Sequence, residues 1–153
     1  GDKMTARIFF TILITITFIF AQRGETWNIS ESVYAVSTID LEPNVDAQYV
    51  NQLKLTWYNN MEVFKSEGLV EEFHIFKSIN QYDGDFDLLL IVKYKNLAIL
   101  DSNPKNNKMW KKAEDKARKI ISEEEVQNIT SAFPKLRTIL DQKFMREITF
   151  IEK

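Results

Sequence analysis

Residues 69–95 read LVEEFHIFKSINQYDGDFDLLLIVKYK. Two stretches rich in β-branched and aromatic residues, 69–79 and 85–95, lie on either side of Asp83-Gly84. An Asp-Gly pair between two apolar runs is the strongest short-range signal for a β-hairpin, because the tight turn needs positive φ angles. The segment therefore predicts two antiparallel strands joined by a turn at Asp83-Gly84.

The sequence before this hairpin predicts a strand followed by a helix. Residues 33–41, VYAVSTIDL, are rich in β-branched residues and read as the strand. The helix is expected from about 45 to 67, with Asn44 as its N-cap and Gly68 at its C-terminal end. Three- and four-residue spacing predicts a core-facing stripe, with Leu53 alongside, that consists of Ala47, Val50, Lys54, Trp57, Met61 and Phe64.

The sequence after the hairpin predicts more helix and a final strand. A short helical turn is expected over 96–101 and a helix over about 105–121, with an apolar stripe of Met109, Ala113, Ala117 and Ile120. Ser122 and Glu125 form a capping box that begins another helix. Residues 145–152, MREITFIE, alternate and predict the last strand. The order βαββαβ is that of a ferredoxin-like α+β domain over 33–153, with a four-stranded antiparallel sheet and helices on one face.

Both faces of this sheet are predicted to be apolar. In the strand after Gly84, Phe86, Leu88, Leu90, Val92 and Tyr94 point one way, and Leu89 and Ile91 point the other. A sheet with one face in water should alternate with polar residues instead. We therefore expect two sheets to pack face to face in a homodimer. The alternative is that the C-terminal helices or the N-terminal leader cover the second face.

The N-terminus has the pattern of a secretory signal. Residues 8–20 carry no charge and follow Lys3 and Arg7. This run is shorter than the roughly 20 residues of a membrane span, so we expect cleavage near Ala21 or Gln22. The signal peptide would then be 1–22, followed by a flexible leader over 23–32, and the protein would be secreted or periplasmic with no membrane span. A retained anchor and a buried strand are the alternatives.

The composition excludes several classes of site. The 153 residues include no cysteine and one histidine, with a net charge of −2. Disulfides, thiolate catalysis and multi-His metal sites within one chain are therefore excluded. A mildly acidic chain is also not typical of nucleic-acid binding. No phosphate-binding or dinucleotide motif is present, and we expect no cofactor.

A resemblance to a known family follows from three segments. The run YKNLAILD at 94–101, the tetrad RTIL at 137–140 and the segment FMREI at 144–148 resemble the dimeric α/β-barrel superfamily, and small secreted bacterial members in particular. The resemblance covers about residues 32–153 and implies a sheet-to-sheet dimer. Members include cofactor-independent monooxygenases, haem-degrading enzymes and proteins with no known activity, so the resemblance implies a fold and leaves the activity open.

His74 is the candidate catalytic residue, because it alone titrates near neutral pH. On its strand it shares a face with Glu72 and Phe76, opposite Phe73 and Ile75. The haem-degrading relatives carry their histidine on a helix, so their assignment does not transfer. We expect a structural, half-buried and neutral imidazole in apolar surroundings.

Other candidates concern ligands, metals and anionic surfaces. The candidate ligand-binding residues are Trp57, Tyr94, Arg137 and Arg146, and the two arginines are suited to a carboxylate or phosphate. Asp83, Asp85 and Asp87 are weak metal candidates, because their spacing departs from the calcium loop. The lysines of 105–119 predict a solvated helix face, with an anionic surface as the alternative.

These patterns predict an exported dimer without a demonstrable catalytic motif. The first hypothesis is a non-enzymatic module that holds a small apolar ligand or has a structural role. The alternative is a cofactor-independent monooxygenase-like or haem-handling enzyme that uses the barrel interior. An enzyme would need an enclosed cavity with His74 or another polar group aimed into it.

Overall fold

The computed structural model describes residues 26–80 and 85–151, which fall into two compact units. The larger unit, 31–146, contains one antiparallel sheet with the strand order β3-β4-β2-β5. Its strands are β2 (Val33–Leu41), β3 (Glu72–Lys77), β4 (Leu88–Tyr94) and β5 (Arg137–Met145). This order, with a helical crossover in each half, is the ferredoxin-like arrangement predicted from the sequence.

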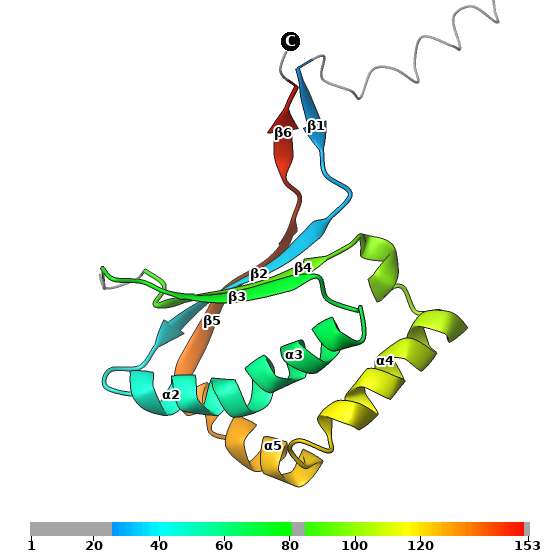
Figure 1. Ribbon diagram of the computed structural model, residues 1–153. Helices are drawn as coiled ribbons and strands as arrows, with labels where there is room; N and C mark the ends of the chain where they lie inside the picture. Colours follow the sequence, from blue (N-terminus) through cyan, green and yellow to red (C-terminus); the bar gives the residue numbers. More distant parts are fainter. Residues whose placement is uncertain (1–25, 81–84, 152–153) are drawn as a thin grey trace, which may run out of the picture. The chain divides into compact units, whose positions relative to one another are not determined.

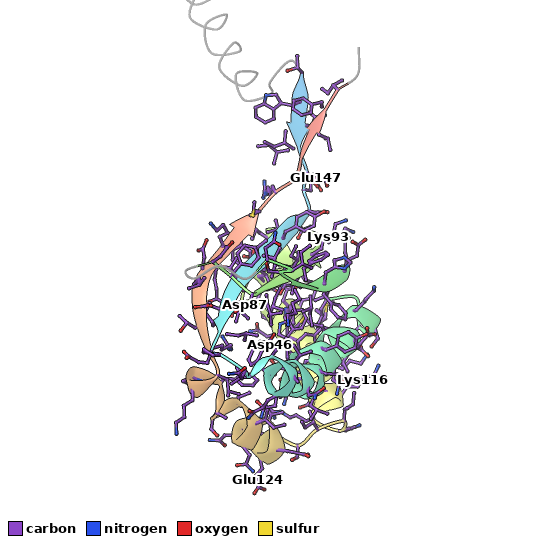
Figure 2. All side chains as sticks on the ribbon, turned by 90° about the vertical axis from the view of Figure 1, so that its left-hand side faces the viewer. Asp46, Asp87, Lys93, Lys116, Glu124 and Glu147 are labelled. Atoms are coloured by element: carbon purple, nitrogen blue, oxygen red, sulfur yellow. The ribbon has the colours of Figure 1, made fainter. Side chains whose placement is uncertain are left out.

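The helices of the larger unit lie on one face of this sheet (Figure 1). The first crossover is formed by α2 (Asp46–Leu53), the π-helical turn η1 (Lys54–Tyr58) and α3 (Asn59–Ser66). The second contains η2 (Leu97–Leu100), α4 (Pro104–Ala117), α5 (Glu123–Thr130) and η3 (Phe133–Lys135). Charged side chains such as Asp46, Lys116 and Glu124 lie on this helical layer, whereas Asp87 and Lys93 lie at the sheet (Figure 2).

Helix termini in the larger unit follow the predicted signals, except at Asn44. Gly68 has φ +74° and ends α3, and the Ser122 hydroxyl accepts a hydrogen bond from the Glu125 N–H at 3.2 Å. The N-cap of α2 is Val45 instead of Asn44, without a side-chain hydrogen bond. Asn44 is instead in the left-handed region, at φ 66°.

The predicted core stripe of the first helix is wrong by one position. Ala47, Val50 and Lys54 are exposed, while Trp57, Met61 and Phe64 are only half-buried. The buried residues are Tyr49, Leu53, Thr56 and Val63. Two of them carry a hydroxyl: Tyr49 packs against Phe133, and the Thr56 hydroxyl donates to Gln52 O at 2.8 Å. The offset of one position is the same before η1, at Tyr49 and Leu53, and after it, at Val63.

The helical stripe of α4 is confirmed at its centre. Ala113 and Ala117 are buried against Val63 and Leu69. Ile120 is exposed instead, because α4 ends at Ala117 and the chain turns so that Ile121 becomes buried.

The last strand of the sheet is β5, and the predicted strand over 145–152 is confirmed only at Ile148–Phe150, which does not belong to this sheet. The pairing of β5 with β2 changes register between Thr38 and Ile39 of β2, so that Leu140 of β5 has no partner in β2. This bulge interrupts the alternation by which a strand is recognised. The smaller unit holds β1 (Trp27–Ile29), in the stretch assigned to a leader, and β6 (Ile148–Phe150), which pair with each other.

The core lies between the sheet and the helices. Its largest cluster consists of Ile39, Leu41, Tyr49, Leu53, Leu88, Leu90, Phe133 and Leu136. The predicted alternation in β4 is confirmed: Leu88, Leu90 and Val92 are buried, whereas Leu89 and Ile91 lie on the uncovered face and are half-buried. Asp83-Gly84 lies outside the described residues, but the antiparallel pairing of β3 with β4 that it predicts is present.

Candidate functional site

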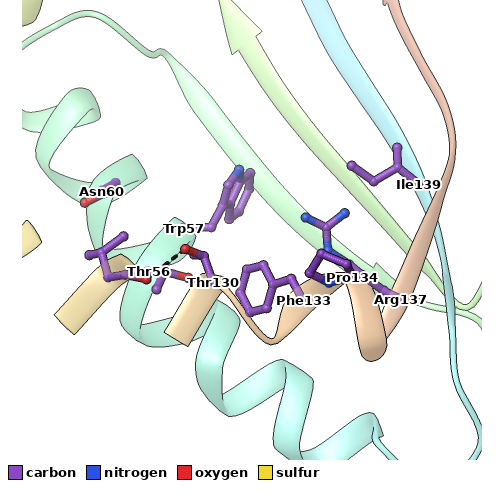
Figure 3. A pocket seen from close by; sticks show the side chains of 9 residues that line it. Thr56, Trp57, Asn60, Thr130, Phe133, Pro134, Arg137 and Ile139 are labelled. Carbon is purple, nitrogen blue, oxygen red and sulfur yellow. Dashed lines mark hydrogen bonds between the residues drawn. The ribbon is translucent and has the colours of Figure 1, made fainter. Parts of the chain in front are cut away.

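A pocket of about 630 Å³ lies on the helical side of the sheet, near β5. Its walls come from the first crossover, from the α5–η3 segment and from β5 (Figure 3). We call it the α5–β5 pocket; it is lined by Thr56, Trp57, Asn60, Val126, Thr130, Phe133, Pro134, Arg137 and Ile139. Its volume is in the range of small-molecule sites, which is about 300–1,000 Å³. It exists because the helical layer leaves β5 partly uncovered, so that Ile139 is 43% exposed.

The two aromatic walls of the pocket are fixed by neighbouring rings. Trp57 packs edge-on against Phe73 of β3, with ring centroids 5.7 Å apart and planes at 83°. Phe133 packs against the buried Tyr49 at 5.1 Å. These geometries are among the favourable ones for aromatic pairs. The pocket therefore has a rigid apolar surface at both Trp57 and Phe133.

Among the described residues that line the pocket, Arg137 provides the one charged side chain. Its guanidinium lies over two rings, 5.2 Å from the centroid of Phe133 and 5.6 Å from that of Tyr49. Burial raises the pKa of the Tyr49 phenol, and the charge and hydrogen bond of Arg137 oppose that rise. The Arg137 Nε is buried and has no hydrogen-bond partner within the described chain.

The other polar groups of the pocket are neutral. The Thr130 hydroxyl donates to Val126 O at 2.9 Å. The Thr56 hydroxyl likewise donates to a backbone oxygen four residues earlier, Gln52 O, at 2.8 Å. Both hydroxyls therefore face the pocket with acceptor capacity only. Asn60 adds an amide and also lines a smaller neighbouring pocket of about 220 Å³, which shares Val126.

Two of the four predicted ligand-binding residues meet in this pocket. Trp57 and Arg137 are 80 positions apart in sequence and line it together (Figure 3). Tyr94 is half-buried at the end of β4, where burial raises its pKa, and it does not line the pocket. Arg146 is exposed just beyond the far end of β5, about 30 Å of strand from Arg137 at roughly 3.4 Å per residue. The two arginines therefore cannot grip one small anion.

His74 lies on the sheet face opposite the pocket. The predicted alternation is confirmed, with Phe73 and Ile75 turned toward the helices. The expectation of a half-buried imidazole in apolar surroundings is wrong, because its side chain is 55% exposed. Its described partners are Glu72, with Nε2 3.9 Å from a carboxylate oxygen, and the ring of Phe76.

The described members of the acidic run have local roles. Asp87 accepts a hydrogen bond from the Leu41 N–H, and Asp85 accepts one from the Phe86 N–H. Asp83 lies outside the described residues. Within 26–80 and 85–151, no three His, Asp or Glu side chains are close enough together to hold a metal ion. No helix in these ranges has the length and hydropathy to cross a bilayer.

Sequence reasoning missed most of the pocket lining. Thr56, Asn60, Thr130, Phe133, Pro134 and Ile139 were not candidates. One signal was available, because Phe133-Pro134 follows a capped helix and precedes an arginine. That Phe133 and Arg137 face Trp57 depends on how β5 pairs with β2, which no local pattern reveals.

Comparisons with known proteins find solved structures that are similar to this chain at low sequence identity. No protein-family model and no curated protein matches the sequence. Among solved structures, HapK from Hahella chejuensis has a TM-score of 0.45 at 10% identity, over 75% of this chain and 91% of that one. A dimeric ferredoxin-like protein of unknown function from Bacteroides fragilis has a TM-score of 0.35 at 8% identity, over 81% and 100%. Another from Thermobifida fusca has 0.33 at 5% identity, over 77% and 91%.

Proposed function

We propose that this chain is an exported, homodimeric and non-enzymatic protein that binds a small ligand with an apolar body in the α5–β5 pocket. The observation that carries the proposal is the pocket itself. About 630 Å³ of space is bounded by two fixed aromatic rings, aliphatic side chains and few polar groups. Small-molecule sites typically combine an apolar lining of this kind with a small number of placed polar groups.

The lining favours binding over acid–base catalysis. It contains no histidine, aspartate, glutamate, lysine or tyrosine among the residues that the structure describes. General acid–base catalysis needs a titrating group within hydrogen-bonding reach of the substrate. His74, the sequence candidate for that role, lies on the opposite face of the sheet. The described lining therefore offers the monooxygenase-like and haem-handling alternatives no acid–base group.

Binding of a neutral apolar dye, N-phenylnaphthylamine, to the full chain tests the proposal. The dye's fluorescence should rise on binding, and Ile139→Trp, which fills the pocket, should weaken the affinity by about tenfold or more. Thr130→Phe is a second filling variant if the first does not fold. Leu97→Trp is the control, because Leu97 is exposed and outside the pocket. Absence of binding, or binding that the filling variants leave unchanged, would refute the proposal.

The exported state is tested separately by mass. Protein recovered from the secretory compartment of the producing cells should begin near Gln22 or Arg23. The signal-peptide pattern in the sequence of residues 1–22 supports this expectation. An intact mass that retains residues 4–21 would contradict it.

A further inference from the structure

We infer that the ligand of the α5–β5 pocket carries one carboxylate, which pairs with the Arg137 guanidinium while Trp57 and Phe133 hold its apolar body. This inference rests on the proposed function and names the chemical class of the ligand. It depends on the charge of the lining, the fixed position of Arg137 and its unused hydrogen-bonding capacity.

The charge of the described lining is uncompensated. Arg137 contributes a positive charge and no lining residue contributes a negative one. In the described ranges, no carboxylate oxygen lies within 4.0 Å of the Arg137 nitrogens, although other arginine and lysine side chains there do form ion pairs. A cation beside an apolar cavity without a counter-ion attracts an anionic group, and low local polarity strengthens that attraction.

The guanidinium is held in place by its two aromatic neighbours. Its Cζ lies over the rings of Tyr49 and Phe133, 5.6 and 5.2 Å from their centroids, and Tyr49 is fully buried. Figure 3 shows its terminal nitrogens pointing away from Pro134, toward the space between Trp57 and Ile139. A fork of N–H donors fixed in this way loses little conformational entropy when it binds a carboxylate bidentately.

The pocket favours a monoanion over a phosphate. A phosphate monoester carries more than one negative charge near neutral pH and is typically held by several cationic or N–H donors. Here the described lining has one cation, and Arg146 is at the far end of β5. One guanidinium balances one carboxylate, and the remaining side-chain N–H donors of the described lining are neutral: the Asn60 amide and the Trp57 indole.

Two probes of equal shape test the inference on the full chain. Naphthylacetate and naphthylacetamide share an aromatic body and differ in the charge of the terminal group. Each is used to displace N-phenylnaphthylamine from the pocket. In the wild type, the acetate should bind more tightly than the amide by about tenfold or more, because a charge-assisted bidentate pair exceeds a neutral hydrogen bond.

Substitutions then assign this preference to Arg137. Arg137→Met keeps an apolar stem over Tyr49 and Phe133, and it should abolish the preference for the acetate while leaving amide affinity within about threefold. Arg137→Lys should retain a reduced preference, because it keeps the charge and loses the fork. Arg146→Met is the matched control, since it removes a guanidinium outside the pocket. It should leave the preference unchanged.

The possible outcomes separate the inference from the proposed function. If the dye binds in the pocket but the acetate displaces it no better than the amide, the carboxylate inference is overturned and the binding function stands. The same holds if Arg137→Met and Arg137→Lys both keep the full preference. If the dye does not bind in the pocket, the proposed function fails and the inference fails with it.

Discussion

The carboxylate of Asp87 accepts a hydrogen bond from the backbone N–H of Leu41 at 2.8 Å, across 46 positions of sequence. The backbone of Asp87 makes two more bonds, donating to Ile39 O at 2.8 Å and accepting from Ser78 N at 2.7 Å. Asp87, directly before β4, is therefore tied both to β2 and to the residue that follows β3. The sequence suggests Asp87 as a metal ligand, but in the structure its carboxylate and backbone form a structural link within the sheet.

Loss of this link should destabilise the fold. Asp87→Ala leaves the Leu41 N–H, in a buried residue, without its acceptor, and we expect a loss of about 1–3 kcal/mol in urea unfolding. Asp87→Asn should lose less, because the amide oxygen still accepts. Asp85→Ala is the control, since that exposed carboxylate bonds only the next N–H within the described part of the chain, and it should change stability by less than about 0.5 kcal/mol. Equal losses at the two aspartates would contradict this role.

Local signals predicted the elements better than the long-range pairing. Gly68, Ser122 and the apolar run 33–41 were correctly interpreted, because capping and β-branched patterning act within a few residues. β5 was missed because its bulge at Leu140 breaks the alternation and most of its residues stay exposed. Tyr49 was missed as a core residue because the predicted stripe runs through Val50, and the contacts of Tyr49 with Phe133 and Arg137 are remote in sequence.

The residues of the candidate site also divide into those that a local signal could select and those that only long-range pairing brings together. Trp57 and Arg137 could be selected from residue type, since a tryptophan on a helix and an isolated arginine are common ligand contacts. Their meeting in one pocket requires α5 and β5 to come beside the first crossover, which is a property of the whole fold. Ile139 carries no residue-level signal of binding, and the signal at Phe133 is its place between a capped helix and an arginine. They become lining residues only through the path of the chain between α5 and β5.

Gly68 should tolerate substitution poorly for reasons of backbone alone. Its φ of +74° lies in the left-handed region, and a Cβ placed there would meet no atom within 4 Å. Gly68→Ala should therefore destabilise by about 1–2 kcal/mol through strain. Gly68→Asn should lose less, because asparagine tolerates this region. Asn44, at φ 66°, is the reciprocal control: Asn44→Gly should be neutral or stabilising in thermal unfolding. Equal effects of Ala and Asn at position 68 would argue against a backbone cause.

Glu67 should make stability depend on pH. Hydrogen bonds from Lys112 and Lys116, at 2.6 and 3.1 Å, hold the pKa of this carboxyl below its ordinary value of 4.5. A carboxyl whose pKa falls on folding stabilises the native state above its unfolded pKa, and this contribution is lost as the pH falls through the folded pKa. Glu67→Gln should therefore be less stable than wild type at pH 7, and the difference should disappear in acid.

Chemical unfolding at several pH values measures this effect. Glu42→Gln is the control, because Glu42 is exposed and makes no ion pair in the described part of the chain. It should leave the pH profile unchanged. A Glu67→Gln profile parallel to that of wild type at all pH values would show that the contact with α4 acts through packing instead of charge.

The uncovered face of the sheet should form the dimer interface. Cross-strand rows there bring together Phe76, Leu89 and Thr38, and next to them His74, Ile91 and Val36. Phe76 is 51% exposed in the single chain. Apolar side chains gathered on one sheet face favour packing against a second copy. Light scattering at micromolar concentration should therefore give twice the mass of one chain.

Charged substitutions within these rows should separate the dimer without unfolding the chain. Leu89→Lys and Ile91→Lys each place a charge on this face, where it stays solvated in a monomer and is desolvated in the dimer. Both variants should give the mass of one chain while circular dichroism remains native. Ile120→Lys is the matched control, because Ile120 is 57% exposed and lies beyond α4, on the helical side. A wild type with the mass of one chain, or a dimer that withstands both substitutions, would refute the face-to-face arrangement.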